Sequence, residues 1–149
     1  MRNLKTALGV LLVLPVVIGC NPNSPEFVLP EGDARNGQAL FVSYSCTSCH
    51  TVRDLELPQP EFEGPVKIPL GGGVSKLKSY SELVTSIVNP SHKLYERRRA
   101  EDVSQDGESL MAVYNDRMTV TELIDIVAFL ETRYTKLERP KVKYTVHKY

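Results

Sequence analysis

The segment Cys46-Thr47-Ser48-Cys49-His50 brings two thiols and an imidazole within five positions of the chain. This spacing is typical of covalent haem c attachment, in which each thiol forms a thioether with one vinyl group of the porphyrin. His50 follows the second thiol directly and is the predicted proximal ligand of the iron. The sequence therefore predicts one covalent haem c, held by Cys46, Cys49 and His50.

Paired cysteines also occur in two other kinds of site. A thioredoxin-like redox pair follows a strand, whereas the residues before Cys46 have a helical pattern. A structural zinc site requires four ligands, and no second cysteine pair follows Cys49 to complete one. Both alternatives fit the residues less well than haem does.

A second axial ligand would decide whether the iron is closed or open to small molecules. The candidates are Met111, Met118, His92 and His147. Met118 directly precedes Thr119, which begins a predicted helix, and Leu123 follows at the position that completes a hydrophobic staple. Met118 therefore already has a structural role, whereas Met111 lies in the middle of a loop. Met111 is the favoured ligand, with Met118, a histidine or an open position as alternatives.

The length and composition are those of a small single domain. The 149 residues carry 18 basic and 18 acidic side chains, so no overall charge attracts the chain to nucleic acid or to an anionic surface. Seven Tyr, four Phe and no Trp offer modest material for a core. A covalent porphyrin would supply the missing apolar mass.

The N-terminus has the pattern of a targeting segment. Arg2 and Lys5 precede an apolar run from Ala7 to Ile18, which is too short for a typical membrane span. The run ends in Val17-Ile18-Gly19-Cys20, which resembles a bacterial lipobox, and this implies cleavage before Cys20 and lipidation of its thiol. We expect residues 1–19 to be a lipoprotein signal peptide and residues 20–30 to be a tether. Ordinary secretory cleavage and an uncleaved anchor are the alternatives.

Three segments have clear helical signals. Asp33 is a predicted N-cap for a helix from Ala34 to about Tyr44, in which Gly37 suggests that another backbone approaches closely. Capping boxes predict a short helix after Ser79, ended by Asn89-Pro90, and a final helix from Val120 to about Tyr134. The intervening residues 51–78 and 91–118 are predicted to form long loops, since Pro and Gly interrupt the first of them repeatedly.

These segments resemble the small bacterial class I cytochromes c across about residues 31–137. The resemblance lies in Gly32–Phe41, in Ser86–Ser91, in Met111–Tyr114 and in Met118–Leu130. It implies an all-α fold, a cytochrome c-like bundle of three to four helices wrapped around one covalent haem, with long loops. It also implies that Met111 binds the iron and that the face formed by Gly37 and Phe41 packs against Phe129, Leu130 and Tyr134.

The sequence departs from the family pattern at two places. The family usually has proline after the ligand methionine, and this chain has Ala112. The family also has a Gly-Pro loop whose carbonyl orients the proximal imidazole, and both Gly64-Pro65 and Pro69-Leu70-Gly71 are candidates for it. The basic tail at residues 138–149 lies outside the resemblance.

The expected function is that of a membrane-tethered monohaem c-type cytochrome, a carrier and not an enzyme, at the bacterial cell envelope. It would move single electrons between redox proteins facing the periplasm or the cell exterior. The long loops and the tail also fit a tightly bound haem subunit of a larger respiratory or dehydrogenase complex. A peroxidase would require that Met111 does not bind the iron. Arg97-Arg98-Arg99 is expected to be a solvated face, a docking patch or a counter-charge for the haem propionates.

Overall fold

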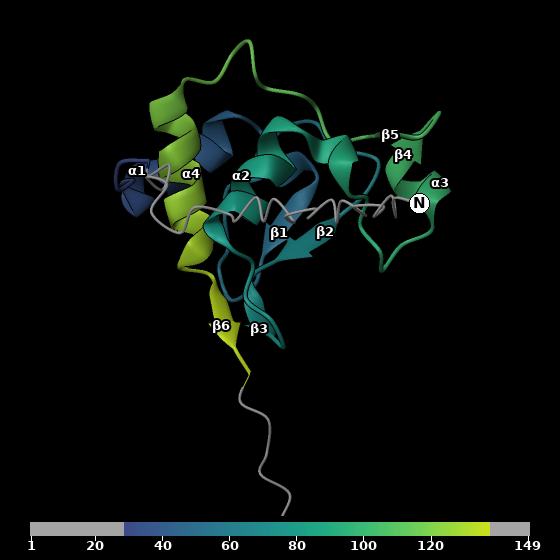
Figure 1. Ribbon diagram of the computed structural model, residues 1–149. Helices are drawn as coiled ribbons and strands as arrows, with labels where there is room; N and C mark the ends of the chain where they lie inside the picture. The colour runs from purple at the N-terminus through teal and green to yellow at the C-terminus, as the bar shows by residue number, and fades with distance from the viewer. Residues whose placement is uncertain (1–28, 138–149) are drawn as a thin grey trace, which may run out of the picture.

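The computed structural model describes residues 29–137. The described helices are α1 (Ala34–Ser43), α2 (Tyr80–Val88), the short α3 (Ala100–Val103) and α4 (Val120–Glu131), joined by long connections (Figure 1). The predicted signal peptide, Cys20, His147 and the basic tail lie outside the described residues. The predicted all-α bundle with long loops is confirmed.

Helices α1 and α4 cross with their backbones in direct contact. Gly37 is buried in α1, and a Cβ atom built on it would overlap the carbonyl oxygen of Asp125 in α4. Asp33 caps α1 by accepting hydrogen bonds from the backbone N–H groups of Arg35 and Asn36. The prediction that another backbone approaches Gly37 is therefore confirmed. Gly32 meets the carbonyl of Ile124 in the same way, which the sequence did not indicate.

The carboxylate of Asp125 joins the two helices at this crossing. One oxygen accepts from the backbone N–H of Asp33 at 2.7 Å, and the other accepts from the Asn36 side-chain amide at 2.8 Å. Asp125 is only 6 % exposed. The Asn36 and Asp33 donors stabilise the ionised form and lower the pKa of this carboxyl.

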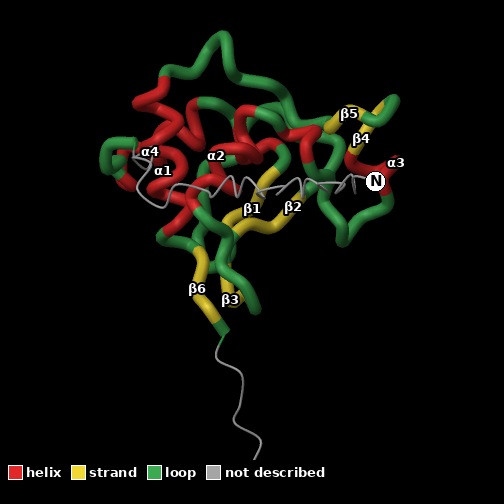
Figure 2. Tube along the Cα trace, viewed as in Figure 1, coloured by secondary structure: helices red, strands yellow, loops and turns green. Residues whose placement is uncertain are grey.

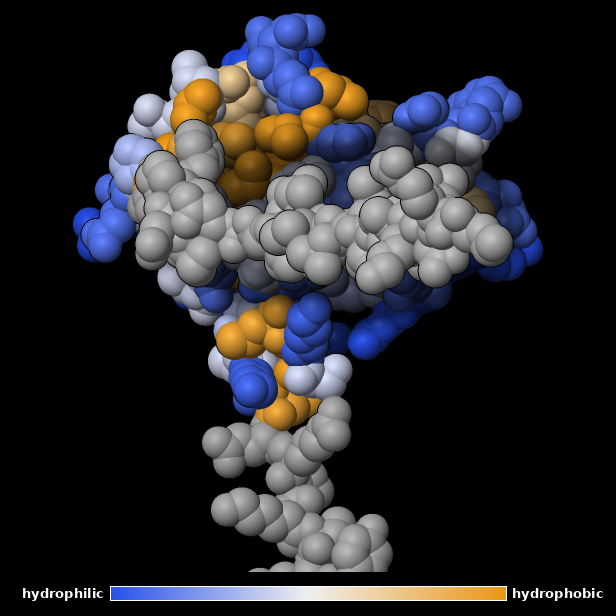
Figure 3. Space-filling model, in the orientation of Figure 1, coloured by the Kyte–Doolittle hydropathy of each residue, from blue (hydrophilic) through white to orange (hydrophobic). Residues whose placement is uncertain are grey.

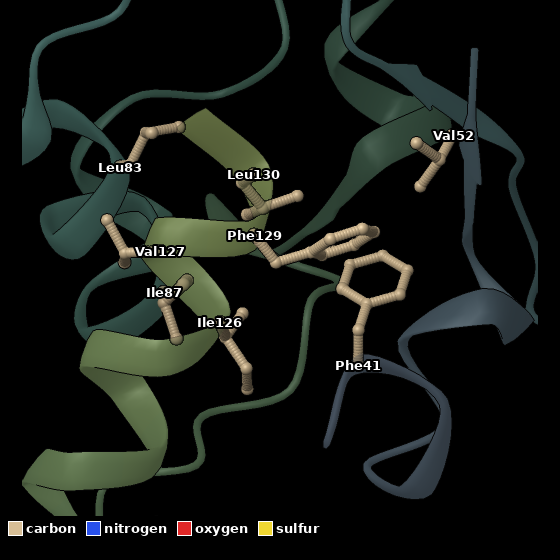
Figure 4. Packing of buried hydrophobic residues seen from close by; sticks show 8 residues of the cluster. All are labelled: Phe41, Val52, Leu83, Ile87, Ile126, Val127, Phe129 and Leu130. Atoms are coloured by element: carbon tan, nitrogen blue, oxygen red, sulfur yellow. The ribbon is translucent and has the colours of Figure 1, made fainter. Parts of the chain in front are cut away.

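The core lies between α1, α2 and α4 (Figure 4). The rings of Phe41 and Phe129 face each other with centroids 5.7 Å apart and planes tilted by 58°. Leu83 and Ile87 contribute from α2, and Ile126, Val127 and Leu130 contribute from α4. Phe41 and the Phe129–Leu130 end of α4 thus pack as the resemblance implied, with Tyr134 partly buried against the same cluster.

Helix α4 ends earlier than its apolar pattern predicted. It stops at Glu131, and Tyr134–Lys136 form strand β6, which pairs in parallel with β3 (Gly72–Val74). The backbone N–H of Gly72 donates to the Arg133 carbonyl at 2.8 Å, so the chain leaving α4 finds partners in a strand instead of a further helical turn. The predicted end near Tyr134 was therefore wrong by one turn.

Short strands interrupt both predicted loops (Figure 2). Strand β1 (His50–Val52) pairs in parallel with β2 (Ile68–Leu70), and β4 (Ser104–Gln105) forms a hairpin with β5 (Glu108–Ser109). The turn residues of that hairpin, Asp106 and Gly107, both have positive φ, as an Asp-Gly hairpin turn requires. Among residues 29–137, no helix is long and apolar enough to cross a bilayer.

Replacing Gly37 by valine should destabilise the protein by about 1–3 kcal/mol, because the branched side chain must push apart two helix backbones that are in contact. Thermal unfolding of the haem-loaded protein measures the effect. Ala39→Val is the matched control, since Ala39 is an exposed residue of the same helix and its substitution carries only the propensity cost of valine. Equal melting temperatures for the two variants would show that Gly37 does not face α4.

Candidate haem site

The two thiols lie on a single tight turn directly after α1. Ser45 adopts a left-handed conformation with φ of 56° and starts the 3₁₀ helix η1 (Cys46–Ser48). The backbone N–H of Cys49 donates to the Cys46 carbonyl at 3.2 Å, which closes the turn. Both cysteines are half-buried and neither forms a disulfide. The turn thus presents two free thiols three positions apart.

The environment of Cys46 does not suit a redox dithiol. Burial raises the pKa of its thiol to about 11, and the neighbouring Cys49 adds to the effect. Reactive dithiols have a lowered pKa at one cysteine, because the thiolate is the attacking species. The thioredoxin-like alternative is therefore not supported by this site. Within residues 29–137, no group of three or more His, Cys, Asp or Glu side chains could hold a metal ion, so the zinc alternative gains no support either.

His50 begins strand β1, and its imidazole is oriented by the neighbouring strand. Nδ1 lies 3.4 Å from the carbonyl oxygen of Ile68 in β2, which can only accept a hydrogen bond. We therefore assign the tautomer with its proton on Nδ1, which leaves the lone pair of Nε2 free for a metal. Burial lowers the pKa of His50, which keeps the ring neutral, as ligation requires.

The carbonyl that faces the His50 imidazole belongs to neither of the two motifs predicted for this role, Gly64-Pro65 and Pro69-Leu70-Gly71. It belongs to Ile68, the residue before Pro69, and its position follows from the pairing of His50 with Ile68 in the parallel strands. The loop at Gly64 has another contact: its backbone N–H donates to the Ser48 carbonyl at 2.9 Å, and a Cβ atom there would overlap Cys49 Sγ. Gly64 thus leaves the space that the second cysteine occupies.

A largely apolar cavity lies beside this turn, with about 580 Å³ of space that includes a part open to solvent. Its walls come from three helices and β2, through Phe41, Leu70, Leu83, Ile87, Ile126 and Leu130. Apolar side chains gather in this region, below the arch formed by residues 110–118 (Figure 3). Cys46, His50 and Met111 also line the cavity, so the structure brings three of the four predicted cofactor residues to one space.

Two of the candidate second ligands line the cavity. Met111 and Met118 both line it, and both are half-buried. His92 is exposed in the 3₁₀ helix η2 (Pro90–His92), where Nδ1 lies 2.7 Å from the Asn89 carbonyl, and it does not line the cavity. The structure therefore favours the two methionines over His92.

Two polar side chains, Lys78 at the cavity and Tyr80 against the core cluster, had no signal in the sequence. Lys78, which precedes the α2 cap, is the one charged residue among the cavity-lining residues in the described part of the chain. The Tyr80 hydroxyl is buried and has no hydrogen-bond partner among the described residues. Arg97, Arg98 and Arg99 are exposed and do not line the cavity, and Arg99 pairs with Asp102 at 3.0 Å. The structure does not support the predicted counter-charge role for these arginines.

These residues fit a covalent haem. The walls are apolar, the thiol of Cys46 lines the cavity, and a neutral imidazole and a thioether are the donors that haem iron accepts in electron carriers. The Lys78 ammonium at the cavity adds a donor of the kind that a carboxylate-bearing group requires.

The family model for cytochrome c matches residues 34–133, more than half of the chain. The chain belongs to the cytochrome c family. Searches among curated proteins and solved structures found no significant match. The family match makes this chain a c-type cytochrome, an electron-transfer haem protein whose family binds haem c covalently. The match begins at the first residue of α1 and ends two residues after α4, so it covers all four helices and every cavity-lining residue except Tyr134.

Replacing both Cys46 and Cys49 by alanine in this cytochrome should abolish covalent haem and leave the chain largely unfolded, because the apolar cavity would lack its filling group. Haem staining after denaturing electrophoresis measures attachment, and circular dichroism measures folding. Cys20→Ser is the control, since it removes the remaining cysteine and leaves the paired thiols in place. Haem staining that survives in the double variant would contradict the assignment of these two residues.

Proposed function

We propose that this cytochrome carries one haem, attached through Cys46 and Cys49 and ligated by His50 and Met111, and that it passes single electrons between redox proteins outside the cytoplasm. The observation that supports the proposal best is the shared cavity. Cys46, His50 and Met111 line it together, although the methionine lies more than 60 positions after the other two. The bound haem iron would supply the one-electron chemistry.

The residues around the cavity would prevent small molecules from binding the iron while leaving it able to exchange electrons. Nδ1 of His50 is held by the Ile68 carbonyl, which would fix the ring while Nε2 binds. The thioether of Met111, if bound to the iron, would favour the ferrous form over the ferric form and raise the reduction potential. Phe41, Leu83, Ile126 and Leu130 would exclude water from the iron.

A redox partner would have to approach the open side of the cavity, since both axial positions would be occupied. Leu110 and Val113 flank Met111 and are 36 % and 57 % exposed, so they offer an apolar contact beside the iron ligand. Contacts of this kind are small and weak, which suits rapid exchange of partners. Nothing in the balanced charge of the chain calls for a nucleic-acid partner.

The ligand assignment is tested by comparing two single variants. Met111→Ala should abolish the long-wavelength absorption band of methionine-bound ferric haem and open the iron to cyanide. Met118→Leu should keep the band, because leucine preserves the apolar contact beside the Thr119 cap. Met111→His should keep a closed iron but lower its potential, since imidazole favours ferric iron more than thioether does. Loss of the band in Met118→Leu and its retention in Met111→Ala would reverse the assignment.

The membrane anchor rests on the sequence pattern before Cys20, which supports lipidation. Three acyl chains would hold the protein on a membrane almost permanently, because even one chain binds measurably. Provided that an ordinary signal peptidase still cuts the chain, Cys20→Ser should therefore release the folded cytochrome into the soluble fraction, with its haem spectrum unchanged. Fractionation of cells that express either form measures the release.

A second candidate function, a fixed subunit of a larger complex, is favoured by the projecting β3–β6 pair. This pair extends away from the helices (Figure 1). Leu137, directly after β6, is 58 % exposed, and Leu77, three residues after β3, is 44 % exposed, so both ends of the pair are followed by exposed apolar side chains. The Cys20→Ser experiment separates the two functions. A variant that stays on the membrane, and is extracted by detergent only together with other redox proteins, would favour the subunit.

A further inference from the structure

The loop that carries Met111 has little regular structure of its own. Residues 111–113 lie between the β4–β5 hairpin and the turn at residues 115–117 and belong to neither helix nor strand. Ala112 and Val113 are exposed, and Ala112 stands where the family usually has proline. A ligand on such a loop would leave the iron easily, unless the rest of the loop were held in place.

Two tyrosines connect this loop to the end of α1. The Tyr114 hydroxyl donates to the backbone carbonyl of Tyr44 at 3.2 Å, and the two rings meet edge to face with centroids 5.6 Å apart. In return, the Tyr44 hydroxyl lies 3.0 Å from the backbone carbonyl of Arg117 and 2.9 Å from Glu122 Oε2, so its one proton is shared between two acceptors. The hydroxyl groups of both tyrosines therefore contribute to the link between the loop and the end of α1.

Both ends of this connection are next to the cofactor residues. Tyr44 is the C-cap of α1 and stands two positions before Cys46, while Tyr114 stands three positions after Met111 and itself lines the cavity. Tyr114 also accepts, through its carbonyl, from the backbone N–H groups of Arg117 and Met118 at 2.8 and 2.9 Å. The Arg117 guanidinium lies over the Tyr114 ring, with Cζ 5.1 Å from its centroid.

The far end of the connection is fixed by the N-terminus of α4. Glu122 Oε2, which faces Tyr44, also accepts from the backbone N–H and the hydroxyl of Thr119, each at 2.8 Å. One carboxylate therefore serves the helix cap and the tyrosine together. Because Thr119 follows Met118, the loop from residue 114 to residue 119 is tied to α1 at both of its ends.

We propose that Tyr44 and Tyr114 are positioning residues that hold the Met111 loop closed over the iron, in the place of the missing proline. The inference rests on the proposed ligation by Met111. The pair ties the segment that carries the thioether cysteines to the segment that carries the axial thioether. Loss of either hydroxyl loosens the loop and raises the fraction of molecules in which the sixth position of the iron is open.

Imidazole is the probe for that fraction, because its apparent dissociation constant equals the intrinsic constant divided by the open fraction. In the ferric, full-length protein, Tyr44→Phe and Tyr114→Phe should each tighten imidazole binding about fivefold, the change expected for one ordinary hydrogen bond. Each variant keeps its ring, its covalent haem and the long-wavelength methionine band at neutral pH. The double variant should bind imidazole more tightly than either single variant.

Two matched controls separate positioning from general stability. Tyr95→Phe removes a hydroxyl that makes no hydrogen bond to another described residue, and it should leave imidazole binding unchanged. Ile124→Val trims a buried side chain of α4 that does not line the cavity, and it should lower the melting temperature without changing imidazole affinity.

Three results would contradict the inference. Unchanged imidazole affinity in both tyrosine variants, with a normal methionine band in the unsubstituted protein, would overturn the positioning role alone. Equal tightening in Ile124→Val would show that any loss of stability opens the iron, and would overturn it too. Absence of the methionine band in the unsubstituted protein, with imidazole affinity equal to that of Met111→Ala, would overturn the proposed ligation and the positioning role together.

Discussion

The close approach of α1 and α4 at Gly37 is the constraint on which the rest of the structure depends. No side chain separates the two backbones there, so Phe41, one turn further along α1, meets Phe129 of α4. Asp125 also fixes how the two helices are oriented, because its two oxygens accept hydrogen bonds from Asp33, the N-cap of α1, and from Asn36 in the first turn. The crossing thereby fixes the position of α1, and only two residues separate the end of α1 from the cysteine turn.

The shape of the cavity depends on the same helix crossing, because the cysteine turn follows α1 and part of the apolar wall belongs to α4. Cys46 follows α1, and Ile126 and Leu130 belong to α4. A shift at the crossing would therefore move Cys46 relative to the part of the cavity wall that α4 provides. The proximal side is held separately, by the pairing of His50 with Ile68. Met111, the proposed second ligand, lies on a loop instead, and the side-chain contacts of Tyr44 and Tyr114 connect that loop to the end of α1.

The features that local sequence predicted are those that a few neighbouring residues determine. The CxxCH motif, the two capping boxes, the Asp33 cap and the close contact at Gly37 all carry their signal within about one or two helical turns. The confirmed boundaries of α1 and α2 follow from such signals.

The features that the sequence did not predict depend on contacts between distant segments. Parallel strands as short as β1 and β2 have no room for a period-two pattern, and their pairing is decided by the whole fold. The Ile68 carbonyl lies 18 positions from His50, and Tyr44 and Tyr114 lie 70 positions apart. Lys78 comes together with the other lining residues only at the cavity. No spacing rule marks such residues, because their roles exist only once the chain has folded.

The cavity and the core are largely the same residues. Phe41, Leu83, Ile87, Ile126 and Leu130 belong to the buried core cluster and also line the cavity. A domain with so few buried apolar side chains gains much of its stability from whatever fills that space, since an apolar group that fills it buries its own surface and that of the walls when the chain folds. A covalent group cannot dissociate, so this contribution is permanent once attachment is complete. Under the proposed attachment, the thiols of Cys46 and Cys49 would therefore be as important to the fold as the helix crossing, although they add almost no packing themselves.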